Sequence, residues 1–132
     1  MRIVNVVRVT KLGAGPVMTI DRIGEVLVAR LGPRYDAFHE TESTAFEQEL
    51  SQAVDDCPAR RIVLDLSQTE YFSSATIETL FRIWKKMESN GDARMAIASA
   101  NPFCREIVTT ARLDDLWPLY PDVDAAVAAL KS

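Results

Sequence analysis

The sequence contains few of the residues that build redox or nucleotide sites. It has only two cysteines, Cys57 and Cys104, and no C-x-x-C spacing, which argues against a disulfide framework. Five glycines are spread over 132 residues, so no glycine-rich loop opens a helix and the phosphate-binding fingerprints are missing. We therefore expect no bound cofactor and no thiol nucleophile.

Histidine is scarcer still, because His39 is the only one in the chain. Its acidic neighbours occupy the expected first turn of a helix, where carboxylates interact favourably with the helix dipole: Asp36, Glu40 and Glu42. We expect no metal site, although a hard-cation site made of carboxylates alone remains open.

The chain also lacks a basic excess and a long apolar run. Its net charge of −4 argues against a general nucleic-acid binder. No apolar run approaches the roughly 20 residues that span a bilayer, and the first ten residues, M-R-I-V-N-V-V-R-V-T, are not followed by a signal-peptide cleavage site. These features predict a cytoplasmic protein of one domain with no membrane insertion.

The hydrophobic pattern alternates between strands and helices. Strands are expected at 17–20 and 26–31, paired as a hairpin around Gly24, and at 61–66, 95–99 and the extended segment L-W-P-L-Y-P. Residues 1–14 are expected to form an N-terminal arm or extra strand, and residues 15–132 the domain. The alternation predicts an α/β domain with helices packed on a mostly parallel or mixed sheet.

Four helices are expected between and after these strands. The first carries an apolar stripe at Ala45, Phe46, Leu50, Ala53 and Val54. The second carries Leu80, Phe81, Trp84 and Met87 and stops at Asn90–Gly91, and the last covers D-V-D-A-A-V-A-A-L. The third begins at Asn101–Pro102, with an expected buried face of Phe103, Ile107, Val108 and Ala111.

Two adjacent serines, Ser73 and Ser74, lie between the central strand and the second helix, in E-Y-F-S-S-A-T-I. Either serine is a favourable N-cap for the helix. A serine hydrolase would need one of them as nucleophile and His39 as base, but G-x-S-x-G is missing and the histidine precedes the serine. We therefore expect no enzymatic activity and no catalytic residue.

The segment D-L-S-Q-T-E-Y-F-S-S-A-T-I-E-T-L, residues 65–80, resembles the STAS domain family of anti-sigma factor antagonists. In that family the central strand ends in D-L-S and leads to D-S-S-G-L at a helix start. The resemblance extends from about Met18 to Leu130 and includes G-P-R-Y-D-A and A-N-P-F-C-R-E-I. It implies a STAS fold, with a four- to five-stranded mixed sheet and about four helices.

The resemblance also implies a switch site. In the family, the second serine of D-S-S-G accepts phosphate from a partner that is both anti-sigma factor and kinase. Aligned without gaps, D-S-S-G-L falls on Ser73, Ser74, Ala75, Thr76 and Ile77. The acceptor becomes Ala75, so the usual phosphorylation is lost. Ser74 and Thr76, which flank Ala75, remain only as displaced acceptors, and Ser74 is the one that we name as a candidate.

A one-residue slip would restore Ser74 as the acceptor. It would also remove Ile77 from the start of the helical apolar stripe, so we adopt the ungapped alignment. Glu78 adds negative charge to the same surface. The implied partner-binding and switch region is thus made of Ser73, Ser74, Ala75, Thr76 and Glu78.

The function implied is a protein–protein interaction module in bacterial signal transduction and transcription regulation. Its partner would be an anti-sigma factor of the serine-kinase type or a related signalling assembly. The alternatives are a scaffold without phosphorylation and a non-enzymatic STAS subunit of a lipid-transport ABC system. A serine hydrolase is the least supported, and the oligomeric state is not specified.

Overall fold

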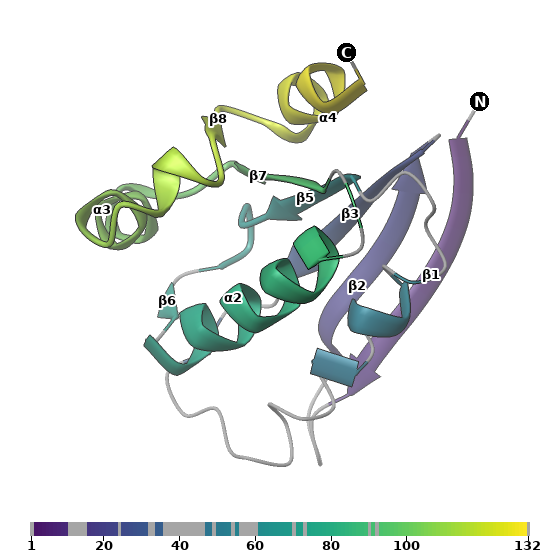
Figure 1. The fold of residues 1–132 in the computed structure, drawn as a ribbon, viewed down its shortest axis with the longest axis horizontal. Coiled ribbons are helices and arrows are strands. Elements are labelled where there is room, and N and C mark those ends of the chain that lie inside the picture. The colour runs from purple at the N-terminus through teal and green to yellow at the C-terminus, as the bar shows by residue number, and fades with distance from the viewer. Residues whose placement is uncertain are drawn as a thin grey trace.

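A computed structural model describes residues 2–10, 16–23, 25–31, 34–35, 47–48, 50–53, 55, 61–69, 71–72, 74–89, 91 and 93–131. Its main sheet has the strand order β1-β2-β3-β5-β7-β8 (Figure 1). These strands are β1 (Arg2–Thr10), β2 (Pro16–Ile23), β3 (Val26–Leu31), β5 (Arg61–Asp65), β7 (Arg94–Ala98) and β8 (Leu119–Tyr120).

The sheet is mixed, as predicted. β2 and β3 form the predicted antiparallel hairpin, and β3, β5, β7 and β8 run parallel to one another. β1 adds a sixth strand, antiparallel to β2, with register irregularities between Ile3 and Val7 and between Val9 and Thr10. Of the extended segment expected near the C-terminus, only Leu119–Tyr120 is strand, and a 3-10 turn, η1 (Leu113–Asp115), precedes it.

The predicted helices are present. Residues 47–48, 50–53 and 55 are helical, followed by α2 (Ser74–Ser89), α3 (Pro102–Thr110) and α4 (Val123–Lys131). α2 ends before Gly91, whose φ of +137° favours glycine, in agreement with the predicted stop. No helix in the described segments combines the length and apolar character needed to cross a membrane.

Two apolar clusters lie on opposite faces of the sheet, because successive strand residues point to opposite sides. The larger packs the strands against α2, α3 and the helical residues 50–53, and includes Leu31, Leu50, Leu64, Leu80, Ile83, Ile97, Val108 and Trp117. The smaller packs Val28, Val63 and Ala96 against Ala126, Val127 and Leu130 of α4. β5 is buried on both sides, as its continuous apolar sequence predicts.

Three residues predicted to be buried are exposed. Phe103 and Phe81 are 48% and 38% exposed, and Ala111 is also exposed. α3 buries Val108, as predicted, together with Cys104, four residues earlier on the same face, so Phe103 is turned away from the sheet by one helical step. On α2 the buried row is completed by Ile83, which leaves Phe81 at its edge. The predicted stripe residues Ala45, Phe46 and Val54 lie outside the described residues.

Candidate partner-binding site

The predicted switch region lies at the start of α2. Ser74, Ala75 and Thr76 are the first three helical residues, and Glu78 is exposed one turn along. The side chains of Ser74, Ala75 and Thr76, and the whole of Ser73, lie outside the described part of the chain. Capping of α2 by either serine therefore stays a prediction.

A short parallel pair of strands leads into this region. β6 (Tyr71–Phe72) directly precedes the serines and pairs with β4 (Arg34–Tyr35) in a separate two-stranded sheet. The pairing joins G-P-R-Y-D-A to the serine segment. The sequence suggested both as family elements but gave no signal that they pair, because two-residue strands have no detectable period.

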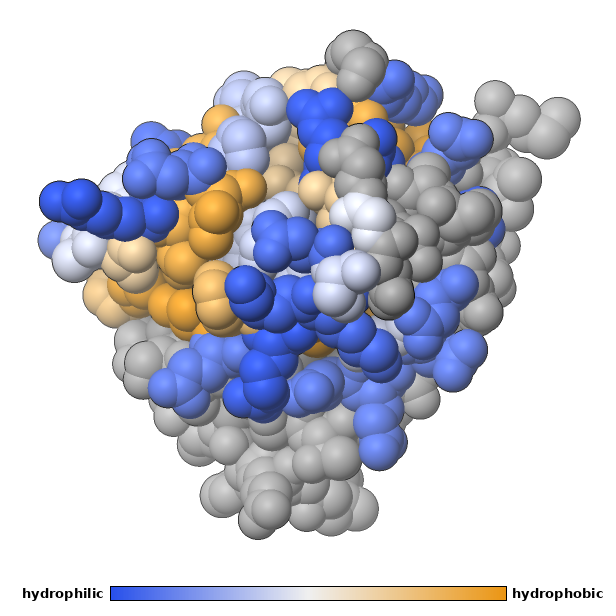
Figure 2. Space-filling model, in the orientation of Figure 1, coloured by the Kyte–Doolittle hydropathy of each residue, from blue (hydrophilic) through white to orange (hydrophobic). Residues whose placement is uncertain are grey.

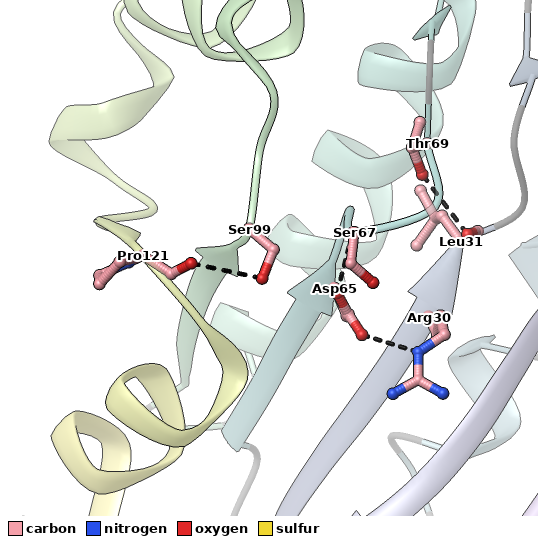
Figure 3. Close-up of polar contacts among 7 residues, drawn as sticks. All are labelled: Arg30, Leu31, Asp65, Ser67, Thr69, Ser99 and Pro121. Carbon is pink, nitrogen blue, oxygen red and sulfur yellow. Dashed lines mark hydrogen bonds and ion pairs between the residues drawn. The ribbon is translucent and has the colours of Figure 1, made fainter.

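The aspartate of D-L-S anchors the end of β5. Asp65 is 1% exposed, and its Oδ2 accepts a hydrogen bond from Arg30 Nε at 2.7 Å (Figure 3). Its Oδ1 accepts from the backbone N–H of Ser67 at 2.9 Å, which fixes the first step of the following turn. Arg30 and Asp65 are register partners on β3 and β5.

Sequence reasoning treated D-L-S only as a family marker and missed Arg30. A signal was present, because a carboxylate at the end of a buried strand needs a cation or several donors nearby. Arg30 occupies the penultimate position of the neighbouring strand.

Thr69 joins three segments behind the switch region. It is 2% exposed, and its Oγ1 donates to the carbonyl of Leu31 at the end of β3, at 3.4 Å (Figure 3). Its own carbonyl accepts from Asn101 Nδ2 at 3.1 Å. We call these contacts among Leu31, Thr69 and Asn101 the Thr69 junction. It ties the end of β3 and the start of α3 to the loop that leads into β6 and α2.

Asn101 is the N-cap of α3, as predicted. Its Oδ1 accepts from the backbone N–H of Cys104 at 2.7 Å, while its Nδ2 reaches Thr69. Ser99, two residues earlier, has a φ of 61° in the left-handed region, which turns the chain from β7 toward α3. Its hydroxyl donates to the carbonyl of Pro121 at 3.5 Å.

Ile77 is partly buried and packs against the larger apolar cluster. With Leu80, Val108 and Leu113 it lines a small apolar cavity between α2, α3 and the sheet. This cavity is too small for more than about one water molecule and offers no room for an organic ligand.

The outer surface near the site combines charge with exposed aromatic side chains. On α2, Arg82 contacts Glu47 at 3.0 Å and Lys85 contacts Glu88 at 3.7 Å; such exposed pairs contribute little to stability. Figure 2 shows a hydrophobic area on the side of the molecule where Figure 1 draws α3. Phe103, in the first turn of α3, is the most exposed large apolar side chain in the described part of the protein.

The described residues at this end of the sheet offer little for nucleophilic or metal chemistry. Cys104 is buried and its Sγ lies 3.9 Å from the carbonyl of Thr69, and burial raises the pKa of the thiol. The described residues contain no group of three or more His, Cys, Asp or Glu side chains suited to a metal ion. His39 and its acidic neighbours Asp36, Glu40 and Glu42, as well as Cys57, lie outside those residues.

Comparison with known proteins identifies the family. The STAS domain model matches residues 21–126. BtrV of Bordetella bronchiseptica, named as a candidate anti-sigma factor antagonist, is 27% identical over 115 residues, which are 87% of this chain and 95% of BtrV.

Two solved structures share the fold at comparable identity. An anti-sigma factor antagonist from Mycobacterium paratuberculosis is 25% identical with a TM-score of 0.72, over 87% of this chain and 93% of that one. A STAS domain protein from Planctomyces limnophilus, described as an anti-sigma-factor antagonist, is 26% identical with a TM-score of 0.70, over 86% and 96%. The chain therefore belongs to the STAS domain family and is an anti-sigma factor antagonist-like member of it.

Proposed function

We propose that the start of α2 and the turn before it bind an anti-sigma factor of the serine-kinase type, or a related signalling assembly, in the bacterial cytoplasm. The region comprises Ser73, Ser74, Ala75, Thr76 and Glu78. The protein acts by binding its partner rather than by catalysis, so it regulates transcription through protein–protein contact.

The observation that carries this proposal is the Thr69 junction. Its hydrogen bonds to Leu31 and Asn101 fix the loop that precedes the switch region to two other elements. A loop held in this way loses little conformational entropy when a partner binds. The exposed Phe103 lies on the helix that the junction ties to this loop, and aromatic side chains are frequent anchors of interfaces.

Phosphorylation control is proposed to be absent at the usual position, which Ala75 occupies. The packing of the partly buried Ile77 against the core supports the ungapped alignment, because that alignment gives Ile77 the apolar position of the family motif. A shift by one would give the position to Thr76. A constitutive or scaffolding interaction is therefore the second candidate, and the replacement at Ala75 favours it over a phosphate switch.

The domain is proposed to comprise residues 15–132, with β1 as an added strand. The family match begins only at residue 21, within β2, which supports placing β1 outside the common domain. A role as the non-enzymatic subunit of a lipid-transport ABC system has no specific structural support.

The test is a binding and mass experiment on the purified full chain. It is incubated with the anti-sigma kinases encoded in its genome, with and without ATP, and the dissociation constants and masses are measured. Binding without added phosphate is the expected result. Failure to bind any of them would refute the anti-sigma role, and a phosphate mapped to Ser74 or Thr76 would restore the switch.

The enzyme alternative has its own check. Any esterase or phosphatase activity of the purified protein should persist in Ser74→Ala and His39→Ala, because it would come from a contaminant. Loss of the activity in both variants would instead support a hydrolase.

A further inference from the structure

The two ends of the Asn101 side chain hold different parts of the molecule. Oδ1 accepts from the N–H of Cys104 at 2.7 Å and so caps α3. Nδ2 donates to the carbonyl of Thr69 at 3.1 Å, 32 positions earlier in the chain. Both groups are needed only if the residue has a second task, because serine or aspartate caps a helix equally well.

The acceptor, the carbonyl of Thr69, lies in the loop that leads from β5 to β6 and the start of α2. Thr69 is 2% exposed, and its N–H donates to Leu66 O at 3.0 Å in the turn after β5. Only Glu70, β6 and position 73 separate it from the first residue of α2. Holding the carbonyl of Thr69 therefore limits where β6 and the start of α2 can lie.

We infer that Asn101 is a positioning residue for the switch region, holding residues 69–76 in the conformation that the partner binds. The inference rests on the proposed function for its meaning, but the positioning itself exists in the free protein. It also explains why α3 contributes to the site, since the same side chain that starts α3 fixes the neighbouring loop.

The contact can be removed without removing the cap. In Asn101→Ser, the hydroxyl caps α3 but is too short to reach Thr69. In Asn101→Asp, the cap also remains, while the second carboxylate oxygen faces the Thr69 carbonyl and repels it. The switch region should therefore be held less firmly in Asn101→Ser than in wild type, and less firmly again in Asn101→Asp.

A matched control is available at α4. Asp122 Oδ1 accepts from the N–H of Ala125 at 2.8 Å, which is the same capping contact without a link to Thr69. Asp122→Ser exchanges one capping residue for another and leaves the junction untouched.

The first measurement is amide hydrogen exchange of the free full-length variants. Exchange across residues 69–76 should become about five-fold faster in Asn101→Ser, the loss of one hydrogen bond, and faster again in Asn101→Asp. Exchange in β5 and α3 should stay as in wild type, and Asp122→Ser should match wild type throughout. Unchanged exchange in 69–76, or an equal increase throughout the protein, would overturn the inference.

The second measurement is the dissociation constant for the anti-sigma kinase that binds wild type. Asn101→Ser should weaken binding about three- to ten-fold, while Asp122→Ser should not. If wild type binds none of these kinases, the proposed function fails and hydrogen exchange alone decides the positioning role. If wild type and Asn101→Ser bind equally, the proposed function stands and the positioning role fails.

Discussion

Arg30 and Asp65 are paired across neighbouring parallel strands, with Arg30 Nε 2.7 Å from Asp65 Oδ2. The pair is asymmetric, because the Asp65 side chain is 2% exposed and that of Arg30 is 40% exposed. Asp65 also holds the N–H of Ser67, so one buried carboxylate joins two strands and starts the loop that leads to the switch region. The family motif D-L-S therefore has a structural explanation for its first residue.

This difference in exposure predicts that replacing Arg30 and replacing Asp65 lower the free energy of unfolding by different amounts. Arg30→Met leaves a buried carboxylate without its cation and should lower the free energy of unfolding by about 3–5 kcal/mol. Asp65→Ala leaves Arg30 free to be solvated and should cost about 2–3 kcal/mol. Urea denaturation of both single variants and the double variant measures these values. The double variant should cost less than the sum of the two, and simple additivity would show that the pair is not coupled.

Restoring serine at position 75 should create a phosphorylation site. With the kinase that binds wild type, and with ATP, Ala75→Ser should gain one phosphate, because the hydroxyl then stands in the family's acceptor position at a helix N-terminus, where a dianion is tolerated. Mass spectrometry with peptide mapping gives the position. Ser74→Ala in the same background is the control, and loss of the phosphate in that double variant would show that Ser74 is the true acceptor.

Phe103 should contribute to partner binding and not to folding. Its ring is 48% exposed in the first turn of α3, so Phe103→Ala should change the unfolding temperature little. It should weaken the anti-sigma kinase complex by about 1–3 kcal/mol in calorimetry, the range for an aromatic anchor. Leu116→Ala is the control, because Leu116 is similarly exposed (43%) but follows η1, beyond the other end of α3. Equal losses in both variants would remove Phe103 from the interface.

Cys104 should be protected from alkylation in the folded protein. Burial raises the pKa of its thiol, so the reactive thiolate is scarce at neutral pH. In a Cys57→Ser background, where Cys104 is the only thiol, iodoacetamide should react at a rate limited by unfolding. Rapid labelling under native conditions would contradict the burial.

The same shift gives a pH dependence of stability. The folded thiol keeps its proton to higher pH than the unfolded one, so stability is unaffected below the ordinary thiol pKa of about 8.5. Above it, the free energy of unfolding should fall by up to about 1.4 kcal/mol per pH unit until the folded thiol also ionises. Cys104→Ala should lack this component, which denaturation curves between neutral and alkaline pH will measure.

Arg112 is a site where glycine should stabilise the protein. It follows the C-cap of α3 with a φ of 59°, a left-handed conformation that glycine adopts without the cost of a side chain. Arg112→Gly should raise the free energy of unfolding by up to about 1 kcal/mol. Arg105→Gly, inside the same helix, should lower it by about 1 kcal/mol, so the two variants should differ in sign.

The sequence was most informative where local chemistry acts within one element. The hairpin of β2 and β3, the apolar β5, the stop at Gly91 and the Asn101 cap each depend on a few neighbouring residues, and each was predicted correctly. Prediction was weaker for burial on α3. A nine-residue helix that packs on one side offers two adjacent apolar stripes, and the predicted buried face included Phe103, which is exposed beside the buried Cys104.

The amino-acid sequence by itself determined the α/β order of elements and, through D-L-S and the serine segment, the family. It did so because strand and helix periods and motif residues are local properties of the chain. Only the tertiary structure decided that Arg30 neutralises Asp65, that β4 pairs with β6, and that Asn101 reaches Thr69. Those contacts join residues 32 to 37 positions apart, and their geometry exists only when the sheet sets the strand register.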